Sequence, residues 1–175
     1  MKSRLLILAA CVLCASSAFA QLKPPIPQTE VYVGGSYYRA GISSGTNLYG
    51  WQTEFDYNLT KHAGVVLDLG GQYEKDKLSG VTVANYQYLI GPQLKHRTGS
   101  WTMFVHGLAG GDAAHVPGLT RGGFAIGFGG GLDRSIGRIA AVRLLQVDSL
   151  HNHFGGVWDH NVRVSAGIVF KFGRP

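Results

Sequence analysis

Residues 49–58, Tyr-Gly-Trp-Gln-Thr-Glu-Phe-Asp-Tyr-Asn, alternate strictly between two kinds of side chain. The odd positions carry aromatic residues or threonine, and the even positions carry glycine or polar residues. Because successive side chains of a β-strand point to opposite faces, this pattern predicts a strand with one apolar and one polar face. A tilted strand of this length is long enough to cross a bilayer.

The same alternation recurs along the chain, and short links alternate with longer ones between the segments that carry it. It predicts eight strands, at 30–40, 48–58, 63–74, 81–95, 101–111, 124–133, 139–149 and 161–172. Short links at 58–62, 95–100 and 134–138 and longer links at 41–47, 75–80, 112–123 and 150–160 are typical of periplasmic turns and extracellular loops. The fold class expected is therefore all-β: an eight-stranded antiparallel up-and-down transmembrane β-barrel.

One of these strands does not alternate cleanly. In 139–149, Arg143 and Asp148 have opposite parity, so both can face the lumen only if the strand contains a bulge or leaves the membrane early.

Period two alone does not say which face lies outside, because a lipocalin-like soluble barrel would turn the apolar face inward around a ligand. Composition favours the membrane. Charged residues make up 15% of the chain, against about 25% in ordinary soluble domains. The polar faces consist largely of glycine, asparagine, glutamine and serine, which suit a narrow lumen better than a soluble surface. The net charge of +6 is scattered, which gives no support to nucleic-acid binding.

The N-terminus has the layout of a secretory signal peptide. Two basic residues, Lys2 and Arg4, precede a short apolar core at 5–15, and small residues lead to a predicted cleavage between Ala20 and Gln21. The core is too short to span a bilayer. A competing interpretation, lipoprotein cleavage before Cys11, would leave an apolar core of only six residues, 5–10.

The expected organisation is thus a signal peptide at 1–20, a proline-rich periplasmic lead-in at 21–29 and an outer-membrane barrel at 30–172. Both cysteines belong to the signal peptide, so the mature chain has no thiol chemistry.

Several stretches resemble the OmpA-like transmembrane-domain family, the eight-stranded outer-membrane β-barrels. They are 57–62 (YNLTKH), 88–93 (YLIGPQ), 129–133 (GGGLD), 143–148 (RLLQVD) and 163–172 (RVSAGIVFKF). The resemblance implies integral insertion among outer-membrane lipids by the barrel-assembly machinery. It also implies that the machinery recognises an aromatic-ended last strand.

The matching aromatic residues here are Phe170 and Phe172, which the resemblance makes the expected assembly signal. One departure from the pattern is that Gly173-Arg174-Pro175 follows the terminal aromatic residue.

Charged residues on the polar faces are the main candidate site. We expect a structural ion-pair network in the lumen, because both signs occur at every level and buried charges are tolerated when paired. Its members are Glu54, Asp56, Asp68, Glu74, Lys95, His106, Asp133, Arg143, Arg163 and Lys171. Strand heights place Glu54 and Arg143 near the middle of the barrel and Arg163 toward its outer end. A proton or ion relay is the competing interpretation.

The third and fourth long links, 112–123 and 150–160, are predicted loops and possible sites for an extracellular ligand. They contain His115, His151, His153 and His160. Two of these histidines could approach one metal ion, but no cysteine or carboxylate pair completes a tetrahedral site, so neither a metal nor a cofactor is expected.

The sequence therefore favours a non-enzymatic outer-membrane barrel with a structural or surface-interaction role. Two alternatives stay open. One is a small-solute or ion pore. The other is a lipid A-modifying enzyme, for which Ser149 with His151 or His153 is the candidate pair.

Overall fold

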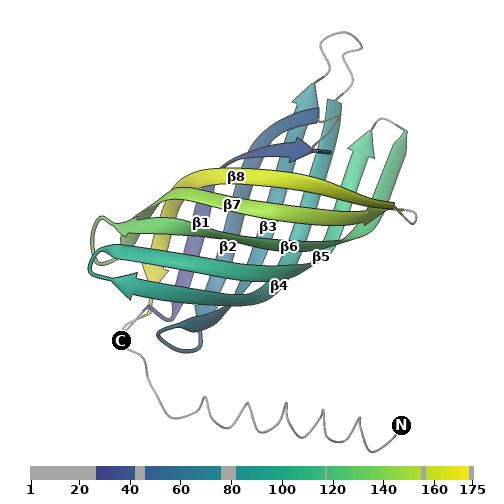
Figure 1. Cartoon of the computed structure of the whole chain (residues 1–175). Coiled ribbons are helices and arrows are strands. Elements are labelled where there is room, and N and C mark those ends of the chain that lie inside the picture. The colour runs from purple at the N-terminus through teal and green to yellow at the C-terminus, as the bar shows by residue number, and fades with distance from the viewer. Residues whose placement is uncertain (1–26, 42–45, 76–81, 117, 155–156, 174–175) are drawn as a thin grey trace, which may run out of the picture.

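The computed structural model describes residues 27–41, 46–75, 82–116, 118–154 and 157–173, and these form a closed antiparallel β-barrel (Figure 1). The predicted signal peptide and residues 21–26 of the lead-in lie outside the described residues. The strands are β1 (Thr29–Ala40), β2 (Thr46–Asn58), β3 (Ala63–Lys75), β4 (Thr82–Thr98), β5 (Trp101–Val116), β6 (Leu119–Ser135), β7 (Ala140–Phe154) and β8 (Val157–Phe172). The predicted fold class is confirmed. In the described part of the chain, no helix is long and apolar enough to cross a membrane.

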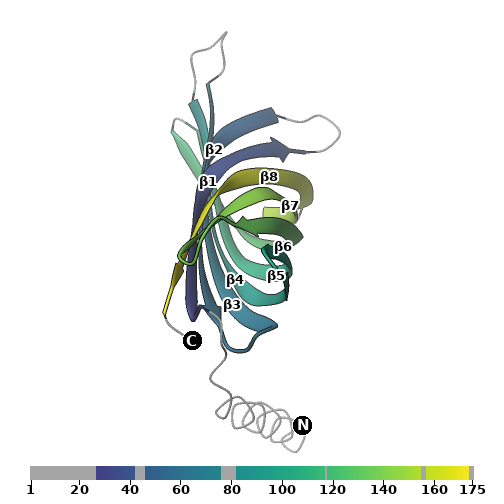
Figure 2. The ribbon, with the colours of Figure 1, turned by 90° about the vertical axis from the view of Figure 1, so that its left-hand side faces the viewer.

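Each strand pairs with its neighbours in sequence, and β1 pairs with β8 to close the barrel. The closing register sets Val31 opposite Phe170 and Thr29 opposite Phe172. Closure leaves no open sheet edge, which a lipid environment requires because it cannot satisfy free backbone groups. The two ends of the barrel chain lie beside the short turns: the Asn58 backbone N–H donates to the Gln28 carbonyl at 2.9 Å (Figures 1 and 2).

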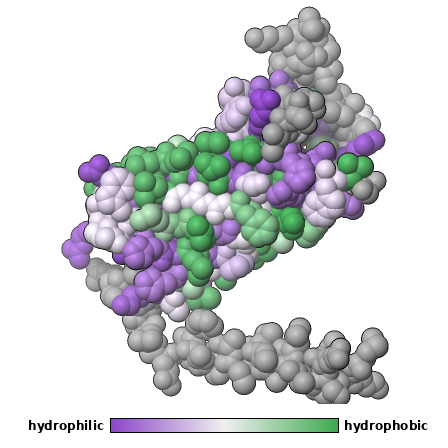
Figure 3. All heavy atoms as spheres, in the orientation of Figure 1, coloured by the Kyte–Doolittle hydropathy of each residue, from purple (hydrophilic) through white to green (hydrophobic). Residues whose placement is uncertain are grey.

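Residues that alternate in the sequence lie alternately on the outer and the inner face of the barrel wall. In β2, Trp51, Phe55 and Tyr57 are exposed on the outer surface, whereas Gln52 and Glu54 are completely buried in the lumen. On the face seen in Figure 3, most hydrophobic residues gather over the middle of the wall, with hydrophilic residues toward its ends. The apolar side chains therefore face outward, as a lipid-embedded wall requires and as a soluble barrel would not tolerate.

A β-bulge in β7 resolves the parity conflict between Arg143 and Asp148. The pairing of β7 shifts register on both sides, so that Leu144 is an extra residue without a counterpart on β6 or β8. Leu144 and Leu145 are both exposed on the outer surface, and Arg143 and Asp148 are both buried in the lumen. The bulge therefore delivers two charged side chains to the same interior.

We expect deletion of Leu144 to be tolerated. It would leave Arg143, Leu145 and Gln146 as an ordinary inward, outward, inward series, with Arg143 still opposite Gly167 and Gln146 opposite Ser165. Deleting Val147 instead would make Gln146 and Asp148 adjacent, so that one of them turns to lipid. Gel mobility with and without heating, which distinguishes folded from unfolded barrels, should show a folded first variant and an unfolded second one. Equal folding of both would contradict this account of the bulge.

The predicted long loops at 112–123 and 150–160 are wrong. β5 continues to Val116 and β6 begins at Leu119, whereas β7 continues to Phe154 and β8 begins at Val157. These segments are therefore hairpins of the barrel wall. These segments were predicted as loops because glycine, histidine and tryptophan interrupt the apolar alternation there. Strand pairing persists because the backbone hydrogen-bond ladder does not need an apolar outer face beyond the lipid.

Candidate functional site

Arg143, on β7, lies at the centre of the lumen and is completely buried. Its Nη1 lies 2.5 Å from Glu54 Oε2, and its Nε donates to Asp133 Oδ1 at 2.8 Å. The guanidinium also lies between two aromatic rings, 4.3 Å from the centroid of Tyr32 and 4.2 Å from that of Phe104. Arginine suits this position because its planar group pairs with carboxylates at its edge and stacks on rings at its faces.

Arg163, on β8, forms the second centre. It donates to both oxygens of Asp68, at 3.0 and 2.6 Å, and to Asp148 Oδ2 at 2.8 Å. A further bond of 3.1 Å reaches the side-chain oxygen of Gln87. On the other side of Asp148, Oδ1 lies 2.8 Å from His106 Nε2. A buried cation thus has two carboxylates within contact, which offsets the cost of removing it from water.

Two glutamines join these centres into one network. Gln52 Nε2 donates to Glu54 at 3.0 Å and to Asp68 at 2.6 Å, and Gln146 Nε2 donates to Glu54 at 2.6 Å and to Asp148 at 3.1 Å. All five residues have 1% exposure or less. The network therefore connects opposite walls of the barrel through side chains that exclude solvent.

A separate cluster closes the end of the barrel that bears the short turns. Lys95 Nζ contacts Glu30 Oε2 and lies 2.7 Å from Asp56 Oδ2. Arg97 lies 3.2 Å from Glu30 and donates to Asn58 Oδ1 at 3.3 Å. This cluster gives the lumen a second polar layer.

Glycines on the inner face of β6 make room for these side chains. A Cβ at Gly129 would lie 2.0 Å from Asp148 Oδ1, and one at Gly131 would lie 2.6 Å from the Phe104 ring. The inner glycines are therefore required by packing, because larger residues would displace the groups that pair with the two arginines.

Most of the predicted lumen residues meet in these clusters, and two stand apart. Glu74 is half-buried near the outer end of β3, and Lys171 is half-buried near the turns, where its Nζ donates to Ser135 Oγ at 2.6 Å. Arg163 does not lie in an outer layer of its own, because its long side chain reaches Asp68 in the middle.

The sequence interpretation left three charged members out of the network: Glu30, Arg97 and Asp148. Glu30 shares parity with the buried Tyr32, which would have identified it had the first strand been treated as regular. Arg97 lies beyond the predicted end of its strand. Asp148 faces the lumen together with Arg143 only because β7 contains a bulge between them.

The β7–β8 hairpin carries a group of polar aromatic side chains on its outer face. The rings of His151 and His160 stack edge to face at 4.5 Å, and those of His153 and Trp158 lie 4.9 Å apart. Ser149 Oγ lies 3.2 Å from His151 Nε2. Across the described ranges no three His, Cys, Asp or Glu side chains form a potential metal site.

Comparison with known proteins gives matches at the level of structure. No family profile matches the sequence, and no curated protein sequence does. Neisserial surface protein A is similar with a TM-score of 0.68 at 11% identity, covering 83% of this chain and 97% of that one. Ail, the attachment invasion locus protein of Yersinia pestis, gives 0.58 at 14% identity, covering 83% and 99%.

A third similar structure is the outer membrane protein OprG from Pseudomonas aeruginosa, with a TM-score of 0.55 at 10% identity, covering 84% of this chain and 97% of that one. Identities this low establish architecture alone. The chain thus has the fold of the eight-stranded outer-membrane β-barrels.

Proposed function

We propose that this chain is an exported, integral protein of the bacterial outer membrane that acts through the surface it presents outside the cell. It neither conducts solutes nor catalyses a reaction. The buried network around Arg143 and Arg163 is the observation that carries the proposal. Its paired groups fill the lumen from wall to wall, which a solute pore would have to leave open. The outward apolar band and the similar outer-membrane barrels support the location.

The contact between Ser149 and His151 does not favour the enzyme alternative. A catalytic histidine is oriented by a third group, usually a carboxylate, and the nearest ring to His151 is that of His160. Both residues lie on the outer face of β7, and neither lines the cavity at the end of the barrel that could exclude water from a reacting ester.

Cysteine labelling in intact cells tests the location and orientation. The only cysteines, Cys11 and Cys14, fall within the predicted signal peptide, so a single introduced cysteine is a unique label site. A membrane-impermeant maleimide should label Val157→Cys, at the start of β8, in intact cells. The matched variant Lys61→Cys, in the turn after β2, should be labelled only after lysis. Labelling of Lys61→Cys alone would reverse the orientation, and labelling of neither in intact cells would contradict surface exposure.

A further inference from the structure

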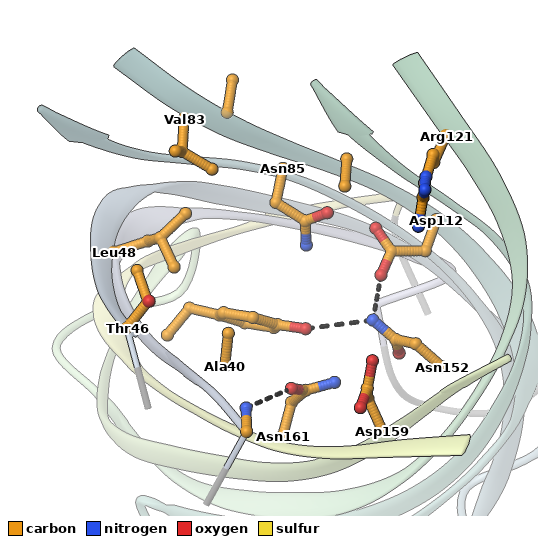
Figure 4. Close-up of a pocket in the computed structure, with 14 residues that line it drawn as sticks. Ala40, Thr46, Leu48, Val83, Asn85, Asp112, Arg121, Asn152, Asp159 and Asn161 are labelled. Carbon is orange, nitrogen blue, oxygen red and sulfur yellow. Dashed lines mark hydrogen bonds between the residues drawn. The ribbon is translucent and has the colours of Figure 1, made fainter. Parts of the chain in front are cut away.

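A cavity of about 370 Å³ lies at the outer end of the barrel, opposite the short turns (Figure 4). We call it the outer cup. Polar side chains from four strands line one part of it: Asn85 of β4, Asp112 of β5, Asn152 of β7 and Asn161 of β8. Leu48, Val83 and Ala84 line another part. Its rim carries exposed residues and its floor carries buried ones, so the cup is open to solvent on one side.

Asp112 is the anomalous residue of this cup. The other buried carboxylates of the described chain each form an ion pair with lysine or arginine; they are Glu30, Glu54, Asp56, Asp68, Asp133 and Asp148. Asp112 is 1% exposed, yet within the same described ranges it has no basic partner. Arg163, below the cup, is already engaged by two other carboxylates.

The hydrogen bonds of the cup leave two acceptor atoms and one donor, Asn85 Nδ2, without a partner among the described residues. Asn152 Nδ2 donates to Asp112 Oδ2 and to the Tyr38 hydroxyl, the latter at 3.1 Å. Asp112 Oδ1 and Asn152 Oδ1 are buried and have no partner among the described residues. Figure 4 shows Asn85, Asp112 and Asn152 turned toward one shared space.

The free acceptors outnumber the free donor, and one of them belongs to a carboxylate, so the cup suits a group that is rich in donors and positively charged. An ammonium group has three N–H donors and meets both demands. Tyr38 also lines the cup, and aromatic rings attract cations. The volume of the cup exceeds what a bare ion fills, and its apolar wall suits an aliphatic chain.

We propose that the outer cup binds a small organic cation, a primary ammonium group on a short aliphatic body, with Asp112 as its counter-ion. The proposal deepens the proposed surface function by naming a ligand class, and it rests on that function for its biological setting. Arg121 and Asp159 at the rim carry opposite charges and are exposed, so they leave Asp112 as the dominant charge.

Binding to the purified barrel in an uncharged polyoxyethylene detergent tests the proposal independently of location and orientation. The probe is n-butylammonium, with n-butanol as its neutral counterpart, calcium as a metal cation and potassium chloride to hold ionic strength constant. Calorimetric titration should show saturable binding of n-butylammonium. n-Butanol should bind about tenfold more weakly or worse, because it lacks the charge-assisted bonds.

Asp112→Asn should weaken n-butylammonium binding by about tenfold or more, because it removes the counter-ion and keeps the shape. Glu74→Gln is the matched control, an acid near the outer end that does not line the cup, and it should change affinity by less than about threefold. Ala114→Leu, which fills the cup beside Asp112 without removing a hydrogen bond, should weaken binding by about tenfold or more as well. It serves as the second variant should Asp112→Asn not fold.

Absence of binding, equal affinity for n-butanol or full affinity in either cup variant would overturn the proposal. Binding of calcium without n-butylammonium would replace it with a metal site. A failure here would leave the cysteine-labelling result untouched, so the two proposals fail separately.

Discussion

Arg163→Met should lower the free energy of unfolding by about 3–5 kcal/mol. Methionine keeps an apolar stem but removes the guanidinium, so it strands two buried carboxylates, Asp68 and Asp148, which Arg163 contacts at 2.6 and 2.8 Å. An unpaired buried charge strongly destabilises the folded protein, whereas removing both partners of an ion pair often does not. Urea titration of the barrel in lipid vesicles measures the change.

Two further variants give that measurement its control. Arg138→Met, in the exposed turn between β6 and β7, should cost less than about 0.5 kcal/mol, because a solvated arginine contributes little. Adding Asp68→Asn to Arg163→Met should recover part of the loss by removing one stranded charge. If Arg163→Met lowered the free energy of unfolding as little as Arg138→Met does, more water would have to reach the lumen than the contacts imply.

Deleting residues 170–175 should abolish membrane assembly, whereas deleting 173–175 should be tolerated. The longer deletion removes the partners of Thr29, Glu30 and Val31 at the closing seam. It exposes backbone groups of β1 that lipid cannot satisfy. It also removes Phe170 and Phe172, the proposed assembly signal, which are exposed on the outer face.

Heat-modifiable gel mobility of membrane fractions reports assembly for both truncations. A third variant, with Phe170 and Phe172 both changed to serine, keeps the seam and tests the aromatic signal alone. Loss of assembly in both truncations would show that the tail after Phe172 matters and that the signal is assigned to the wrong residues.

The sequence was sufficient for the strands whose two faces differ in chemistry. Within residues 49–58 of β2 every outward residue was identified correctly, because alternation sets the face of each residue once one face is assigned to lipid. The predicted strand positions also placed Glu54 and Arg143 at a similar height, and the structure joins them directly.

Two physical features escaped the sequence. One is strand length: the wall continues past the apolar band, so segments expected to be loops are paired strands, and the outer cup that they build could not be anticipated. The other is the distance that a long side chain extends across the lumen. Strand register gives the height of a Cα atom, but a long side chain such as that of Arg163 pairs at another level.

Single-channel recording in planar bilayers tests the closed lumen most directly. A closed lumen predicts no steady, large conductance for the purified barrel, and at most small or flickering events. A triple variant, Arg163→Ala with Asp68→Ala and Asp148→Ala, removes the arginine of one centre together with both of its carboxylates and should conduct more. A steady, large conductance in the unaltered protein, unchanged in the triple variant, would contradict the closed lumen and favour a pore.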